Sequence, residues 1–104
     1  MRDPITAQQF HGSDGVDDWR VVSDRAAAVY RIPSFTAGAE FALAIATIAD
    51  ELDHHPDIDL RAHRVTIRTS THSAKSLTEM DVALAQRIQL AARERQLVAD
   101  PPTE

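Results

Sequence analysis

The chain has 104 residues, a formal net charge of −5 and no cysteine. The acidic balance argues against nucleic-acid binding, which relies on Lys and Arg contacts to phosphates, and the lack of cysteine excludes disulfides and thiolate metal sites. No apolar run could cross a bilayer and the first residues lack a signal-peptide pattern, so we expect one cytoplasmic domain over residues 1–104 that binds neither nucleic acid nor a membrane.

The first half of the chain is predicted to contain a short helix, a hairpin and a longer helix. Residues 4–10 fit a short helix, and residues 19–22 and 26–32 read as two strands around a polar turn. Residues 36–52 place apolar side chains at helical spacing along one stripe. Acidic residues crowd the last turn of that helix, where the helix dipole disfavours anions. These acids fit a functional site and a solvated helix end equally well.

The second half is predicted to form another hairpin and a final helix. Residues 57–61 form a weak strand, and residues 63–71 alternate clearly between apolar and polar side chains. Thr78 and Asp81 form a pair like a capping box at the start of the last helix. Residues 99–104, with two prolines, are predicted to be a frayed tail. The order of elements predicts an α+β fold, a four-stranded antiparallel sheet with helices packed on one face.

Histidines are the candidate functional residues. Three of the five lie in two short segments, Asp53–Pro56 and Ser70–His72, whereas His11 and His63 read as surface residues. A metal site is disfavoured, because adjacent histidines rarely point at one ion and no His-x3-His pattern is present. Nucleophilic catalysis is disfavoured because there is no Gly-x-Ser-x-Gly turn. General acid–base chemistry on a small polar substrate is the remaining interpretation.

The chain resembles the pterin-4a-carbinolamine dehydratases, also called 4a-hydroxytetrahydrobiopterin dehydratases. The resemblance runs from Trp19 almost to the C-terminus and rests on residues shared with that family: Trp19, Phe35, Phe41, Asp53-His54-His55-Pro56, Val65-x-Ile67, Ser70-Thr71-His72, Leu77-Thr78 and Asp81. It implies the same α+β fold and the dehydration of a 4a-hydroxytetrahydropterin, without metal or cofactor, in the recycling of the cofactor of aromatic amino acid hydroxylases. It also implies a homodimer or tetramer, with an aromatic amino acid hydroxylase as a further candidate partner.

The resemblance also assigns site residues. Carried over by position, His54, His55 and His72 are the three active-site histidines. Further positions fall where the family contacts the pterin or carries a carboxylate near the site: Asp53, Ser70, Thr71 and Asp50. We expect His54 and His72 to share the acid and base work, while His55 mainly binds and orients the substrate.

The chain departs from the family pattern at several positions beside the histidines. Asp57-Ile58 stands where the family usually has Glu-Trp, Ala62-His63 stands where it has Tyr-Asn, and Ser76 replaces a glycine. Two large aromatic side chains are therefore missing near the expected site or its rim. The alternative function is a non-catalytic interaction or assembly-factor protein on the same fold, because some relatives act as a dimerisation partner of a transcription factor. A small metal-binding domain is a third reading, which elemental analysis would test.

Overall fold

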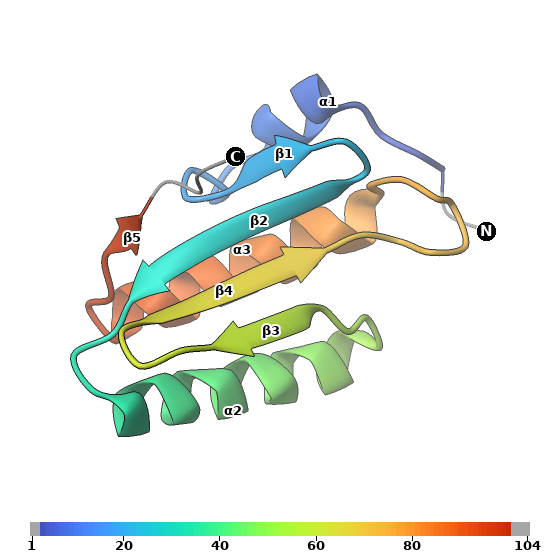
Figure 1. The fold of residues 1–104 in the computed structure, drawn as a ribbon. Coiled ribbons are helices and arrows are strands. Elements are labelled where there is room, and N and C mark those ends of the chain that lie inside the picture. The colour runs from blue at the N-terminus through green and yellow to red at the C-terminus, as the bar shows by residue number, and fades with distance from the viewer. Residues whose placement is uncertain (1–2, 101–104) are drawn as a thin grey trace.

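The computed structural model describes residues 3–100, which form an antiparallel sheet and three helices (Figure 1). The elements in chain order are α1 (Ala7–His11), β1 (Arg20–Val22), β2 (Arg25–Arg31), α2 (Phe35–Leu52), β3 (Asp57–Leu60), β4 (Arg64–Thr69), α3 (Glu79–Glu94) and β5 (Ala99–Asp100). The α+β fold predicted from the sequence is therefore confirmed. None of the helices in this part of the chain is long and apolar enough to cross a membrane.

The sheet has the order β1-β2-β4-β3, so the two hairpins meet at its centre. β2 and β4 pair in antiparallel register from Ala26 opposite Thr69 to Arg31 opposite Arg64. Side chains alternate between the faces, so Ala28, Tyr30 and Ile67 point into the core while their strand neighbours face outward. The same alternation carries Thr69 to the core side and Arg68 to the open side.

α2 and α3 pack on one face of the sheet and on each other, and no helix of residues 3–100 covers the opposite face (Figure 1). The core between these layers is contiguous, and Trp19, Phe41, Leu84 and Ile88 are fully buried in it. The indole N–H of Trp19 is buried without a hydrogen-bond partner among residues 3–100, so this side chain stabilises the fold through its apolar area.

The helix starts follow from their capping residues. The hydroxyl of Ser34 accepts a hydrogen bond from the Ala37 N–H at the start of α2. At the start of α3, Thr78 and Asp81 form the predicted capping box, in which the Asp81 carboxylate accepts from the Thr78 backbone N–H. The sequence thus placed both starts within one or two residues.

A partly buried polar cluster ties the first hairpin to α3. The hydroxyl of Tyr30 donates to Asp18, and Arg93 donates two hydrogen bonds to the same carboxylate. Burial disfavours the ionised form of Asp18, but the hydrogen bonds from Arg93 and Tyr30 outweigh it and lower the pKa of Asp18. Burial and the same carboxylate raise the pKa of Tyr30, so the phenol stays protonated.

The C-terminal prediction requires a correction. Ala99 and Asp100 do not fray; they form β5, a fifth strand that pairs with Val29 and Tyr30 of β2. The carboxylate of Asp100 also accepts a hydrogen bond from Arg31, 69 residues away in the sequence. A two-residue strand has no periodicity of its own, so its pairing follows from the position of the β2 edge. Residues 101–104 of the predicted tail lie outside the described residues.

Candidate functional site

A small cleft opens where β3 begins and β4 ends. It has a volume of about 40 Å³ and is half open to solvent. Its walls come from the start of β2, the segment after α2, and the end of β4, which supply Arg25, His55, Asp57, Arg68, Thr69, Ser70 and His72. Three of the residues expected from the sequence, His55, Ser70 and His72, therefore lie at one place.

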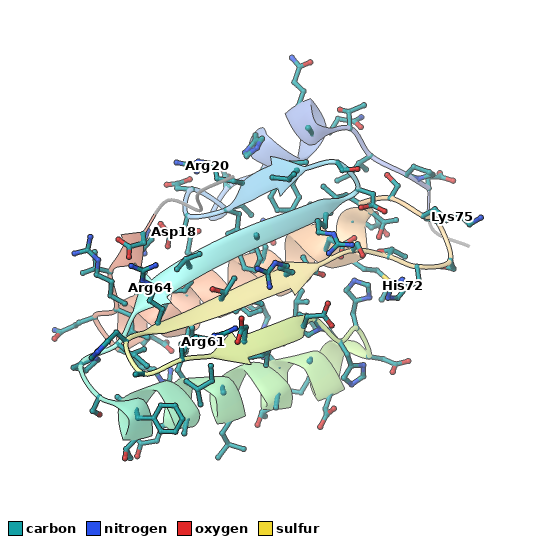
Figure 2. The ribbon with its side chains drawn as sticks, viewed as in Figure 1. Asp18, Arg20, Arg61, Arg64, His72 and Lys75 are labelled. Carbon is teal, nitrogen blue, oxygen red and sulfur yellow. The ribbon has the colours of Figure 1, made fainter. Side chains whose placement is uncertain are left out.

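His72 is held by the short loop between β4 and α3. Thr71 and Ser76 exchange backbone hydrogen bonds across this loop, and the His72 carbonyl accepts from the Lys75 N–H. Lys75 has a left-handed backbone conformation, with φ of 53°, which closes the turn. Figure 2 shows His72 and Lys75 on this loop, at the end of the molecule opposite Arg64. The loop thus fixes the backbone that presents His72 to the cleft.

The end of α2 places His54 and His55 in different surroundings. Asp53 leaves the helix in the left-handed conformation, with φ of 52°, and the His54 N–H donates back to the Ala49 carbonyl. His55 then lies at the cleft, where its Nε2 is 3.0 Å from Oδ1 of Asp50. Both side chains of that pair are exposed, so the contact orients His55 weakly.

His54 contacts a buried carboxylate instead. Its Nε2 is 2.7 Å from Oδ1 of Asp81, its side chain is 11% exposed, and it does not line the cleft. An ionised carboxylate only accepts hydrogen bonds, so this contact holds the proton on Nε2 and leaves Nδ1 of the neutral ring as the basic nitrogen. His54 therefore has the geometry of an imidazole oriented by a carboxylate, the arrangement that positions general bases.

Asp81 is the centre of this arrangement. Its side chain is fully buried and accepts hydrogen bonds from the Thr69 hydroxyl, the Thr71 hydroxyl and the Thr78 backbone N–H, besides its contact with His54. Four partners from three segments compensate for the cost of burying a charged group. The carboxylate consequently links the end of α2, the end of β4 and the start of α3.

Thr71 was expected at the substrate, and its side chain lies on the other side of the backbone. It is 5% exposed, and its hydroxyl contacts Asp81 and Thr78. The alternation of β4 continues to this point, so Thr71 is buried like Thr69, while Ser70 and His72 face the cleft. The side chain of Thr71 therefore supports Asp81 and does not line the cleft. Asp53, also expected at the substrate, is exposed at the end of α2 and likewise does not line it.

The missing aromatic residues do not leave gaps in the cleft. Ile58 faces the core side of β3, opposite Ile67, and packs against the core. Ala62 is exposed in the turn between β3 and β4, at the end of β3 away from Asp57. Neither position is part of the cleft wall.

Sequence reasoning missed two groups at this site. Asp81 was read as a capping residue and as part of the family resemblance, but not as the partner of His54. The signal that could have identified this role is the pair of threonines at 69 and 71, which the strand period turns toward the core. Arg25 and Arg68 were not singled out as site residues, because they are 43 positions apart and meet only through the pairing of β2 with β4.

The donor set does not form a metal centre. Within residues 3–100, no group of three or more His, Cys, Asp or Glu side chains is arranged to hold a metal ion. His54 and His55 point to different carboxylates, Asp81 and Asp50 respectively. The arrangement is suited to proton transfer at a small polar ligand.

The sequence matches the model of a known protein family over most of its length. The sequence model described as "Pterin 4 alpha carbinolamine dehydratase" matches residues 3–91. Two bacterial relatives carry the name "Putative pterin-4-alpha-carbinolamine dehydratase". The one from Herpetosiphon aurantiacus is 44% identical over 70 residues, which cover 67% of this chain and 73% of the relative. The one from Streptomyces avermitilis is 40% identical over 72 residues, which cover 68% and 71%.

A solved structure agrees with the same family. The protein described as "transcriptional coactivator/pterin dehydratase" from Brucella melitensis superposes with a TM-score of 0.80 at 25% sequence identity. The match covers 86% of this chain and 99% of the Brucella chain. The similarity therefore extends over nearly the whole sheet and its helices.

Proposed function

The chain belongs to the pterin-4-alpha-carbinolamine dehydratase family, and we propose that it removes water from a 4a-hydroxytetrahydropterin to give a quinonoid dihydropterin. The observation that carries this proposal is that imidazoles from two separate segments, His55 after α2 and His72 after β4, line one cleft. The reaction is a hydro-lyase step, in which the C4a–O bond breaks and a ring nitrogen loses its proton.

The chemistry needs one acid and one base. The leaving hydroxyl at C4a must gain a proton to depart as water, and the ring N–H must give up a proton as the new double bond forms. Imidazole can do either near neutral pH, and such proton transfers accelerate reactions by about 10²- to 10⁴-fold. The reaction is balanced without an oxidant or a reductant, because the two products are the quinonoid pterin and water.

We assign the acid and base work to His54 and His72. The contact of His54 with the buried Asp81 supports a base role, because it holds the ring through Nε2 and leaves Nδ1 free to accept a proton. His72 lines the cleft, and the loop Thr71–Ser76 holds its backbone. His55, on the cleft wall beside the exposed Asp50, binds and orients the pterin.

The remaining expected residues take supporting roles in the proposal. Ser70 contacts the pterin from the cleft wall, and Asp50 orients His55. Thr71 acts indirectly, by holding Asp81 behind His54. Asp53 closes α2 and leaves its exposed carboxylate beside the histidines, where a bound pterin that extends beyond the small cleft would meet it.

A stopped-flow assay of 4a-hydroxytetrahydropterin dehydration at neutral pH tests this function. We expect acceleration over the spontaneous reaction, and a fall in kcat of about 100-fold or more in His54→Ala and in His72→Ala. His55→Ala should mainly raise KM. His63→Ala is the matched control, because this exposed histidine lies in the turn between β3 and β4.

Two results would overturn these assignments. If the native protein does not exceed the spontaneous rate, the chain is not a dehydratase. If His55→Ala loses most of kcat while His54→Ala and His72→Ala retain theirs, the division of roles is wrong.

The biological setting is part of the same proposal. A dehydratase of this kind acts in the cytoplasm, in pterin cofactor recycling, and its product returns to an aromatic amino acid hydroxylase. A second candidate function, a non-catalytic interaction protein, is favoured by the "transcriptional coactivator" in the description of the Brucella protein. The same assay separates the two, because an interaction protein would leave the spontaneous rate unchanged and would tolerate His72→Ala.

A further inference from the structure

The cleft wall contains two arginines that have no role in the proposed acid–base catalysis. Arg25 and Arg68 line it together with His55 and His72. Asp57 is the one carboxylate among the residues of its wall. With both histidines neutral the wall has a formal charge of about +1, and protonation of either ring raises it further. This contrasts with the net charge of −5 on the whole chain.

The register of the sheet brings the two arginines together. Arg68 on β4 lies opposite Ala27 on β2, and Arg25 is two residues from Ala27 on the same face. Arg25 and Arg68 are therefore diagonal neighbours, a spacing that long side chains can bridge. Two cations placed in this way repel each other unless an anion lies between them.

The carboxylates near Arg25 and Arg68 do not pair tightly with either arginine. Arg25 is 3.7 Å from the carboxylate of Asp24, and both side chains are about half exposed. Within residues 3–100 the Arg68 side chain makes no hydrogen bond, but its charge, after the hydrogen bond from Arg61, helps to lower the pKa of Asp59. Its nearest acidic neighbours along the sheet are Asp57, directly opposite on β3, and Asp59, which accepts its hydrogen bond from Arg61 instead. The Arg68 side chain is exposed at the cleft, so its donors are free to meet a ligand.

We infer that the cleft recognises an oxyanion, phosphate or carboxylate, on the side chain of the pterin, with Arg25 and Arg68 as its binding groups. This inference rests on the proposed function and names the class of substrate. The cleft is small, with a volume of about 40 Å³, and both arginines belong to its wall. The anionic substituent lies between the arginines, with Ser70 as a further donor, and the pterin ring lies against His55 and His72 on the same wall.

Binding of a matched set of dihydropterins tests the inference by a readout separate from turnover. The set shares one ring and differs in the 6-substituent: a neutral hydroxyalkyl group, a terminal carboxylate and a terminal phosphate ester. Dissociation constants are measured by ligand fluorescence or calorimetry at low and at near-physiological salt. We expect the anionic ligands to bind at least 10-fold tighter than the neutral one, with the difference shrinking as salt screens the charges.

Arg68→Gln is the test variant, and Arg64→Gln is its matched control. Both residues lie on the open face of β4, but Arg64 is at the strand end far from His72 (Figure 2) and does not line the cleft. Arg68→Gln should raise the dissociation constants of the anionic ligands about 10-fold and leave that of the neutral ligand unchanged. Arg64→Gln should change neither. Inorganic phosphate should compete with the phosphate ester in the native protein and not in Arg68→Gln.

Three outcomes would overturn the inference. They are equal affinity of the native protein for neutral and anionic ligands, equal losses in Arg68→Gln and Arg64→Gln, and competition by inorganic phosphate that survives Arg68→Gln. Failure of the proposed function is a distinct result, because it appears as unaccelerated dehydration of 4a-hydroxytetrahydropterin in the stopped-flow assay, whatever the order of affinity of the three dihydropterins. Circular dichroism and thermal melting of each variant establish that the protein is folded.

Discussion

At the scale of single residues, the contact between His54 and Asp81 decides how the site is built. The Asp81 carboxylate is fully buried and has four hydrogen-bond partners. Besides His54, they are the Thr69 and Thr71 hydroxyls and the Thr78 backbone N–H. Such a group is stable only while its partners stay in place, because an unpaired buried charge is costly. Asp81 therefore serves the fold and holds His54 at the same time.

Replacement of Asp81 tests this double role. Asp81→Asn preserves the shape of the side chain but presents an amide N–H₂ to groups that donate, so at least one donor loses its acceptor. We expect the free energy of unfolding to fall by about 3 kcal/mol, measured by urea denaturation. Asp14→Asn, at an exposed loop position, is the control and should change it by less than about 0.5 kcal/mol. A loss for Asp81→Asn no larger than that of the control would contradict the structural role.

At the scale of elements, the close approach of α2 to the sheet depends on Gly38. A Cβ atom at this position would overlap Cδ1 of Ile32 and lie 2.7 Å from Cδ1 of Leu60. Glycine usually weakens a helix. Here it allows the first turns of α2 to pack against the strands that lead to the site.

A larger side chain at Gly38 should therefore destabilise the fold. Gly38→Val inserts three carbon atoms into a packed contact, and we expect a loss of about 2 kcal/mol from overpacking. Ala39→Val, on the exposed side of the same helix turn, should cost well under 1 kcal/mol, because only helix propensity changes. Urea denaturation of both variants gives the comparison, and equal losses would show that packing is not the cause.

The link between β2 and α3 through Asp18 predicts a pH dependence. Hydrogen bonds from Arg93 and Tyr30 lower the pKa of Asp18 below its ordinary value despite burial. The ionised carboxylate thus favours the folded state, fully so above the unfolded pKa of about 3.9, and this contribution is lost as pH falls through the lower folded pKa.

Asp18→Asn should reveal this contribution. At pH 7 the variant is less stable than the native protein, and the difference should shrink as pH falls from 4 toward 2, where the native carboxyl is protonated. Unfolding free energies measured along this range, with Asp24→Asn as the exposed control, give the test. A difference that stays constant down to the lowest pH would exclude the Asp18 carboxylate as its source.

At the scale of the whole molecule, arginines gather on the open face of the sheet. The open side of the sheet carries a set of arginines, namely Arg20, Arg25, Arg31, Arg61, Arg64 and Arg68, and several of them are visible in Figure 2. The helical side is different: Phe35 and Leu43 of α2 are 58% and 69% exposed, with Ala39 between them on the same face. Exposed apolar side chains that share one helix face are typical of association surfaces.

We expect this helix face to mediate the association of two or four chains that the family resemblance implies. The mass of the native protein in solution, measured by light scattering, should then be a multiple of 11.5 kDa. Leu43→Glu should lower it, because the new charge would be buried in the contact. Gln8→Glu makes the same change of charge on α1 and should leave the mass unchanged. A native protein that stays monomeric at all concentrations would contradict the expectation.

The local pattern of the sequence predicted the fold and the family correctly. Helical spacing over residues 36–52 and alternation over residues 63–71 mark α2 and β4 within a few residues, because a buried stripe must repeat with the period of its own backbone. The capping box at Thr78 and Asp81 is a contact over three positions, and it was equally readable. The histidine motif with its fixed spacing identified the family, although the roles of its histidines stay proposals.

The tertiary structure alone decided what depends on distant segments. It paired β5 with β2, placed His54 against Asp81 across 27 positions, turned the side chain of Thr71 away from the cleft, and brought Arg25 beside Arg68. These features depend on residues far apart in the sequence, so no repeating pattern or short turn motif in the sequence could predict them. They follow from strand register and helix packing, which are fixed only when the whole chain buries its core.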